Sequence, residues 1–287
     1  MNVALVIFFL WKLINTQSLP VLLRTSMAFP AISDVASFIL VLTFGLALTT
    51  MVAKALRLQP QKPDINDKKK QARLTIAVFA ITLIAAFCIY GFYDKVWVRA
   101  TLTADPLYIA RDIIAMLMIL LPTVLTFKLT KQPLSSIAVT KRNLEKSLIL
   151  GFSVSLGLII VLAIFAELLG GGFTGFSISS GYLLLSYMIV SLGEEIVFRG
   201  YLQTRIAASN GPLVAVAVSG FLYGAYNFAL GFYCFGWVIP LAAVYALLRI
   251  STGLVYSYIF HKSQNLASSY IVHVLLVWGG VMFGLYL

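Results

Sequence analysis

Charged residues are scarce in this sequence. They make up 11% of its 287 residues, and only ten residues are acidic, whereas a soluble domain carries about a quarter charged residues. Hydrophobic residues account for 61% of the chain, and the mean hydropathy is +0.97. This composition excludes an ordinary soluble domain and predicts a protein embedded in a membrane.

Cysteine and histidine are also sparse, with two of each. Cys88 and Cys234 both lie in apolar segments, so they indicate small core side chains rather than a disulfide framework. His261 and His273 are twelve positions apart and form no His-x-x-x-His pair. A disulfide-stapled fold and a histidine-rich metal site are therefore not predicted.

The excess charge is positive, with a formal net charge of +11. The basic residues cluster in two short segments, and no platform of aromatic and basic residues accompanies them. Clusters of this kind orient membrane proteins in the lipid bilayer. The bilayer is therefore the predicted partner of the basic segments, and nucleic acid is not.

Long apolar runs occur along the whole chain. Each can cross a hydrocarbon core about 30 Å thick, which predicts an all-α, polytopic membrane protein with about eight transmembrane helices. The expected spans are residues 32–53, 74–93, 108–127, 146–168, 182–203, 212–230, 233–250 and 266–286.

Two apolar segments fit none of these spans. The N-terminal part of residues 1–31 is apolar but carries Lys12, and it can be a ninth span, an interfacial helix or a signal anchor. Residues 253–261 are too short to span. They either enter the membrane and return, or extend a neighbouring helix.

The distribution of lysine and arginine predicts the orientation. Residues 54–73 and 128–146 hold most of the positive excess, whereas 94–107 is balanced and 170–181 has no charge. The positive-inside rule places the two basic loops in the cytoplasm and the other two outside. The span 182–203 then runs from outside to inside.

The segment VSLGEEIVFRGYL, residues 190–202, places three charges inside an expected span. An ionised side chain at membrane depth costs several kcal/mol unless it is paired or lines a wet cavity. Glu195 and Arg199 are four residues apart, which predicts an ion pair on one helix face. Glu194 is rotated by about 100° from Glu195, so it needs another partner, a water or a proton. It is either a general base in a partly dry cavity or part of an ion network for helix packing or conduction.

The pattern Glu-Glu-x-x-x-Arg in this segment resembles the first motif of the CPBP intramembrane proteases. That family comprises the CAAX-processing endoproteases and the bacterial "Abi" bacteriocin-immunity proteins. SGFLYGAYNFALG, residues 219–231, stands where the family has a serine-rich helix ending in Phe-x-x-x-His. Residues 251–277 resemble its last motif, a Thr-Gly turn before a helix with His-x-x-x-Asn.

The resemblance implies roles for the matching residues. Glu194 would activate a water as the base, supported by Glu195 and Arg199. His273 matches the last histidine, which holds the oxyanion of the tetrahedral intermediate in the family. The resemblance covers roughly 145–287.

Two positions depart from the family pattern. Asn227 stands at the second-motif histidine, with Tyr223 in place of phenylalanine, and Val277 stands where asparagine is expected. Asn227 can hydrogen-bond a water or carboxylate but cannot relay a proton near neutral pH. Val277 cannot donate at all, and losing one oxyanion donor typically costs about 10² to 10³ in rate.

The resemblance divides the chain into N-terminal transmembrane helices with basic cytoplasmic loops, 1–144, and a CPBP-like protease core, 145–287. It implies a multi-pass protein of the plasma membrane that hydrolyses a peptide bond in a membrane-associated or lipid-anchored protein or peptide. Its catalytic site would comprise Glu194, Glu195, Arg199, Asn227 and His273.

Alternatives to an active protease remain open. The departures at Asn227 and Val277 favour a catalytically impaired pseudoprotease that binds a membrane partner. A transporter with Glu194 as a proton site is a third hypothesis, although no inverted repeat supports it. No cofactor is predicted, but Glu194, Glu195 and His273 could supply the three protein ligands of a catalytic zinc. The protease interpretation requires Glu194 and His273 to lie closer than one helix diameter, about 10 Å.

Overall fold

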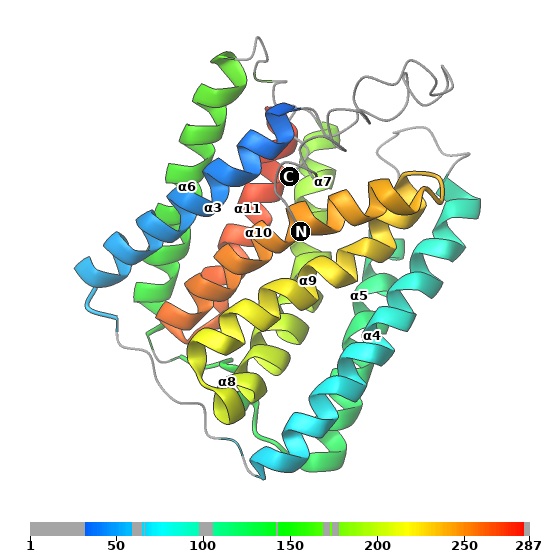
Figure 1. Ribbon diagram of the computed structural model, residues 1–287, viewed down its shortest axis with the longest axis vertical. Coiled ribbons are helices and arrows are strands. Elements are labelled where there is room, and N and C mark those ends of the chain that lie inside the picture. The colour runs from blue at the N-terminus through cyan, green and yellow to red at the C-terminus, as the bar shows by residue number, and fades with distance from the viewer. Residues whose placement is uncertain are drawn as a thin grey trace, which may run out of the picture.

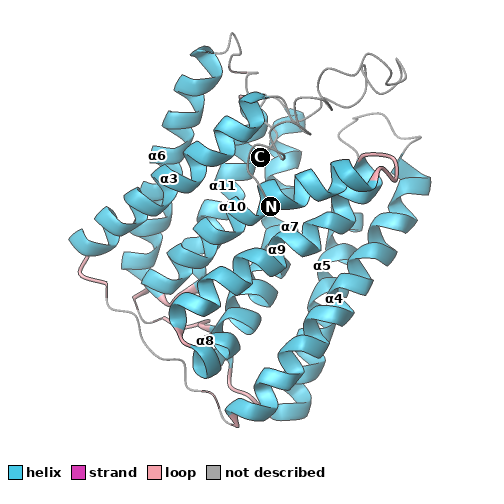
Figure 2. Ribbon diagram, in the orientation of Figure 1, coloured by secondary structure: helices cyan, strands magenta, loops and turns pink. Residues whose placement is uncertain are grey.

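The structure is a computed structural model that describes residues 32–58, 65, 67–97, 106–141, 143–168, 173 and 178–283. These residues are helical apart from turns and short connections, and none of them forms a strand (Figure 2). The predicted all-α class is confirmed. The alternatives for residues 1–31 lie outside the described residues.

The helices follow one another with short connections. In chain order they are α3 (Ile32–Ala55), α4 (Lys68–Trp97), α5 (Pro106–Thr130), the 3₁₀ turn η1 (Leu134–Ile137), α6 (Leu144–Leu168), α7 (Ile178–Glu195), the π-helix η2 (Ile196–Gln203), α8 (Thr204–Asn210), α9 (Pro212–Cys234), α10 (Ile239–Ser263) and α11 (Leu266–Met282).

The chain is an integral, multi-pass membrane protein. Within the described residues, six helical stretches are long and apolar enough to cross a membrane, and two shorter apolar helices accompany them. The six are Lys70–Gly91, Ile109–Thr130, Leu144–Leu168, Ser180–Asn210, Pro212–Tyr233 and Ile239–Ser263, and the shorter two are Ile39–Ala55 and Leu266–Met282. About eight spans were expected, and this set agrees with that number.

The seventh expected span, 233–250, is wrong in its bounds. α9 continues to Cys234, and α10 runs from Ile239 to Ser263 and so includes 253–261, which extends a neighbouring helix. The turn between α9 and α10 is itself apolar and aromatic, so hydropathy does not reveal it. Its local signal is Gly236, whose φ of +60° suits glycine.

The second half of the chain forms the centre of the bundle (Figure 1). α7, α9, α10 and α11 lie together there, with α4 and α5 on one side and α3 and α6 on the other. The start of α4 and the end of α5 lie at the end of the bundle that carries α8 (Figure 1). This common end fits the prediction that both basic loops are on one side of the membrane.

Glycines bring α9 and α10 into close contact. A Cβ added at Gly224 would lie 2.7 Å from the carbonyl oxygen of Ala246, and one at Gly220 would lie 2.9 Å from the backbone nitrogen of Leu254. Both distances are shorter than real Cβ contacts, so the two helices can pack this closely only because glycine has no side chain. α9 is unbroken through Gly224, so Tyr223 and Asn227 lie on one continuous helix.

Candidate active site

The two adjacent glutamates lie where one helix type changes to another. α7 ends at Glu195, and the π-helical segment η2 carries Arg199. The wider turn of a π-helix adds a residue per turn to the α-helical pattern, and such segments occur frequently at functional sites. The sequence spacing assumed a regular α-helix here, so it could not reveal this change.

The predicted ion pair between Glu195 and Arg199 is present. Arg199 Nη1 lies 3.1 Å from Glu195 Oε1, and both side chains are fully buried. Arg199 Nη2 also donates to the carbonyl oxygen of Gly253 on α10 at 3.1 Å. The pair therefore fixes η2 against α10 as well as neutralising one carboxylate.

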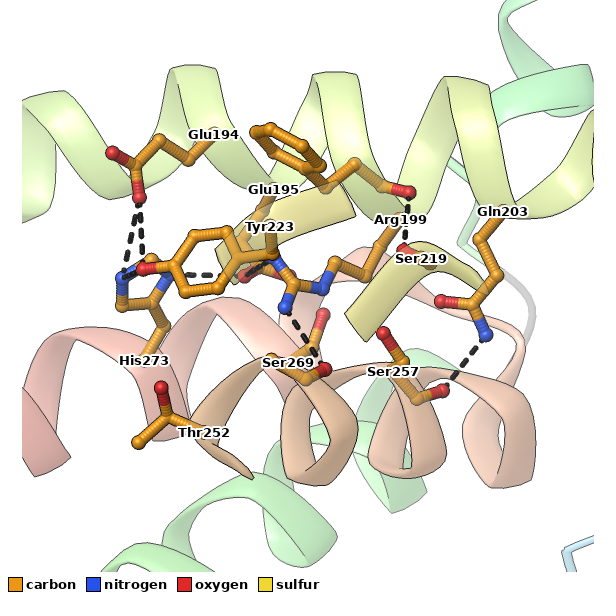
Figure 3. A network of polar contacts seen from close by, with 12 residues as sticks. Glu194, Glu195, Arg199, Gln203, Ser219, Tyr223, Thr252, Ser257, Ser269 and His273 are labelled. Atoms are coloured by element: carbon orange, nitrogen blue, oxygen red, sulfur yellow. Dashed lines mark hydrogen bonds and ion pairs between the residues drawn. The ribbon is translucent and has the colours of Figure 1, made fainter. Parts of the chain in front are cut away.

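Glu194 has partners other than Arg199, as its rotation around the helix required. Its Oε2 accepts from the hydroxyl of Tyr223 at 3.2 Å and lies 3.5 Å from Nε2 of His273 (Figure 3). Glu194 is 6% exposed, whereas Glu195 is 0% exposed. Of the two carboxylates, Glu194 is thus the one that retains some accessible surface.

His273 contacts both glutamates through opposite edges of its ring. Its Nδ1 lies 2.9 Å from Glu195 Oε1, and its Nε2 faces Glu194 and the Tyr223 hydroxyl at 3.1 Å. Both ring nitrogens face a carboxylate, which only accepts, and Nδ1 makes the shorter contact, so the hydrogen of a singly protonated ring is assigned to Nδ1. Glu194 and the Glu195–Arg199 pair are separated by the rotation between adjacent helix positions, and His273 connects them because α11 packs next to α7.

Packing fixes the rings around this cluster. The Tyr256 ring stacks on the His273 ring with centroids 4.5 Å apart, and the Arg199 guanidinium lies 4.6 Å from the centroid of the Tyr223 ring. A Cβ added at Gly253 would come within 3.0 Å of Tyr223 Cδ1. The contacts between the rings therefore hold the phenol and imidazole groups in place, and Gly253 leaves the space in which the Tyr223 ring lies.

The two departures from the family pattern differ in their surroundings. Asn227 is buried, and its amide donates to the backbone carbonyl of Tyr223 at 2.9 Å, one turn earlier on α9. Val277 lies on α11, one turn after His273, and is partly exposed. The structure brings Glu194, Glu195, Arg199 and His273 into one cluster. The approach of Asn227 to Glu194 stays a prediction.

The cluster lies at mid-depth in the helices. Tyr223 is about 16 Å along α9 from Pro212, and His273 is about 10 Å along α11 from Leu266, at 1.5 Å per residue. Both helices begin at the end of the bundle that was expected to be cytoplasmic. Tyr223 and His273 therefore lie within the apolar helices and not at their ends.

The residues considered for a metal are engaged with one another. Glu195 Oε1 is shared by Arg199 and His273, and Glu194 Oε2 contacts Tyr223 and His273. Among the described residues, no group of three or more histidine, cysteine, aspartate or glutamate side chains is arranged to hold a metal ion. The absence of a cofactor stays a prediction.

Sequence reasoning missed two features. Tyr223 was noted only as a replacement for phenylalanine, and its position at the family's aromatic site was the available signal. A second polar cluster joins α5 to α7, where Arg111 pairs with Asp112 at 2.7 Å and Ser186 donates to the same carboxylate. Its signal was an adjacent basic and acidic pair inside an apolar span, the same kind of signal that identified Glu194.

One comparison with known proteins found a match. Residues 176–279 match a family model described as type II CAAX prenyl endopeptidase Rce1-like, and this is the CPBP family. Comparisons with curated proteins and with solved structures gave no significant match. The matched region begins just before α7 and ends in α11, so it contains the whole cluster described above.

Proposed function

Because residues 176–279 match the Rce1-like, or CPBP, family model, we propose that the chain is an active intramembrane endopeptidase. At the level of the family, a membrane endopeptidase is supported by the match itself. The finer proposal is that Glu194 is the general base, that His273 polarises the scissile carbonyl, and that Glu195 and Arg199 orient them.

The observation that carries this proposal is the asymmetry of the Glu194 carboxylate. Its Oε2 is held by Tyr223 and His273, whereas its Oε1 has no hydrogen-bond partner among the described residues. Figure 3 shows this second oxygen pointing away from His273. A carboxylate anchored through one oxygen and open at the other is arranged to accept a proton from a water.

The reaction then follows in balanced steps. Glu194 Oε1 takes one proton from a water, and the water oxygen attacks the carbonyl carbon of the peptide bond. When the tetrahedral intermediate collapses, the carbon–nitrogen bond breaks and the same carboxyl group returns the proton to the leaving amine. Water is the single co-reactant, and the carboxylate is regenerated.

His273 is placed to assist at the carbonyl oxygen. Glu195 fixes the ring through Nδ1, as a carboxylate orients the histidine of a catalytic triad. When Nε2 carries a hydrogen, it can donate to the oxyanion that develops in the transition state. The substrate would be a membrane-associated or lipid-anchored protein or peptide, because the site lies within helices that are apolar enough to cross a membrane. The plasma membrane remains the proposed location.

The test compares matched variants for hydrolysis of membrane peptides by purified protein. Glu194→Gln keeps the shape of the side chain but removes the base, so we expect a loss of at least about 10²-fold in kcat. Glu167→Gln, at an exposed acidic residue of α6, is the control and should keep the wild-type rate. Equal rates for all three proteins would contradict Glu194 as the base.

A double variant, Asn227→His with Val277→Asn, is measured in the same hydrolysis assay. Restoring both groups adds a proton relay and an oxyanion donor, so the double variant should hydrolyse faster than wild type. If only the restored variant hydrolyses peptides, the natural chain is the impaired pseudoprotease of the alternative hypothesis.

A further inference from the structure

The hydroxyl of Tyr223 occupies the point between the two groups proposed to do the chemistry. It lies 3.2 Å from Glu194 Oε2 and 3.1 Å from His273 Nε2, and those two atoms are themselves 3.5 Å apart (Figure 3). The resemblance to the family predicts a phenylalanine at this position. A phenylalanine ring would fill the same volume but would place no hydrogen-bonding group there.

Hydrogen-bond donors are otherwise scarce at this point. With the ring hydrogen on Nδ1, facing Glu195, both Nε2 of His273 and Oε2 of Glu194 are acceptors. Two acceptors at 3.5 Å repel each other through their lone pairs unless a donor lies between them. The Tyr223 hydroxyl can supply that donor. When Nε2 instead carries a hydrogen, the hydroxyl can accept from Nε2 and still donate to Glu194.

The hydroxyl is held in this place by its surroundings. Tyr223 is 2% exposed, its ring carries the Arg199 guanidinium on one face, and the edge contact with Phe198 has centroids 5.4 Å apart. Gly253 leaves the room that the ring occupies. A hydroxyl fixed by packing loses little rotamer freedom when it forms hydrogen bonds, which makes it suitable for positioning other groups.

We propose that Tyr223 is a positioning residue whose hydroxyl holds the Glu194 carboxylate and the His273 imidazole in register, with Glu194 Oε1 left open to water. This inference rests on the proposed function. The Tyr223 hydroxyl also adds a polar group to the site. At the two positions that depart from the family pattern, Val277 has no polar side chain, and the amide of Asn227 donates to a carbonyl of its own helix. Tyr223 acts through Glu194 and His273 and transfers no atom itself.

The natural control lies one turn further on the same helix. Tyr226 is also fully buried, and its hydroxyl contacts that of Tyr90 at 3.4 Å and forms no hydrogen bond with Glu194 or His273. Tyr223→Phe and Tyr226→Phe each remove one buried hydroxyl and keep the ring. A difference between the two variants therefore reports the position of the hydroxyl and not its burial.

The first readout does not depend on turnover. The chain has two histidines, so selective ¹⁵N labelling of histidine gives separate imidazole signals for His273 and for His261, which serves as the internal reference. We expect Tyr223→Phe to shift the Nε2 signal of His273 and leave His261 unchanged, and Tyr226→Phe to shift neither. If Tyr223→Phe does not fold, Glu194→Gln replaces it. With Tyr223 kept, that change should also shift the His273 Nε2 signal, because it alters both the acceptor of the Tyr223 hydroxyl and the carboxylate that faces Nε2.

The second readout is hydrolysis. We expect Tyr223→Phe to lower kcat by about tenfold or more, with KM little changed, because a hydrogen bond to a charged group has been removed. Tyr226→Phe should stay within about twofold of wild type. An unshifted His273 signal, equal rates in the two variants, or a faster Tyr223→Phe enzyme would each overturn the inference. A wild-type enzyme whose hydrolysis does not require Glu194 would overturn the proposed function, and the positioning role with it.

Discussion

Two buried arginines, six residues apart on one continuous helix, are stabilised in different ways. Arg199 forms an ion pair with Glu195 and donates to the Gly253 carbonyl. Arg205 has no carboxylate partner among the described residues. Its guanidinium donates to the carbonyl and hydroxyl oxygens of Ser136 at 2.8 and 3.0 Å, and it lies 4.4 Å from the centroid of the Tyr201 ring.

The difference separates two uses of a buried cation. Arg199 is neutralised by an acid that also orients His273, so its charge belongs to the candidate active site. Arg205 is stabilised by uncharged groups of η1, a turn almost seventy residues earlier in the chain, so it ties α8 to the connection between α5 and α6. The first arginine should therefore affect chemistry and folding, and the second should affect folding alone.

The largest effect on stability is expected from removing Glu195, the acidic partner of Arg199. Glu195→Ala leaves Arg199 and His273 without their shared carboxylate in a fully buried position, and breaking such a pair costs about 3–5 kcal/mol. Glu194→Ala should cost less, because Glu194 is less completely buried than Glu195 and its removal leaves no arginine without a partner. The measurement is the free energy of unfolding in mixed detergent micelles, followed by the loss of helical circular dichroism.

A double-mutant cycle sharpens this prediction. Removing Arg199 together with Glu195 should cost less than the sum of the two single changes, since neither charge is then left unpaired. If Glu194→Ala proves more damaging to folding than Glu195→Ala, the assignment of partners in the cluster is wrong.

The sequence predicted the contacts that depend on spacing within one helix. The pairing of Glu195 with Arg199 followed from their separation of four residues, and the apolar runs predicted most spans correctly. The proximity of His273 to Glu194 came from the resemblance to the family and is present in the structure.

The missed features depend on distances between helices. The contact of Tyr223 with Glu194 depends on how α9 packs against the end of α7 and the start of η2, and on the space that Gly253 leaves for the tyrosine ring. Arg205 meets Ser136 through a turn whose position cannot be read from local periodicity. The π-helical segment was missed because its residues also fit an α-helix, and the start of α10 was missed because the preceding turn is as apolar as the helices it joins.

A smaller effect is expected at the second arginine. Arg205→Met keeps an unbranched side chain but removes the hydrogen bonds to Ser136, which should cost about 2 kcal/mol, in the range of hydrogen bonds to charged groups. No acid is left unpaired, so the loss should be smaller than that of Glu195→Ala. Peptide hydrolysis per folded molecule should match wild type, which the same peptide assay on detergent-purified protein measures. A loss of activity without a loss of stability would contradict the separation of the two arginines.

The smallest effect is expected at Ser136, the residue that accepts the hydrogen bonds from Arg205. Ser136→Ala removes the hydroxyl that accepts from Arg205 Nη2 but keeps the carbonyl that accepts from Nη1. One of the two bonds to this residue survives, so we expect a loss of about 1 kcal/mol in the free energy of unfolding. Ser135→Ala, at the exposed neighbouring position, should change stability by less than about 0.5 kcal/mol. Equal losses for the two serines would mean that the Ser136 hydroxyl does not stabilise Arg205. The guanidinium would then depend on the carbonyl and on the Tyr201 ring.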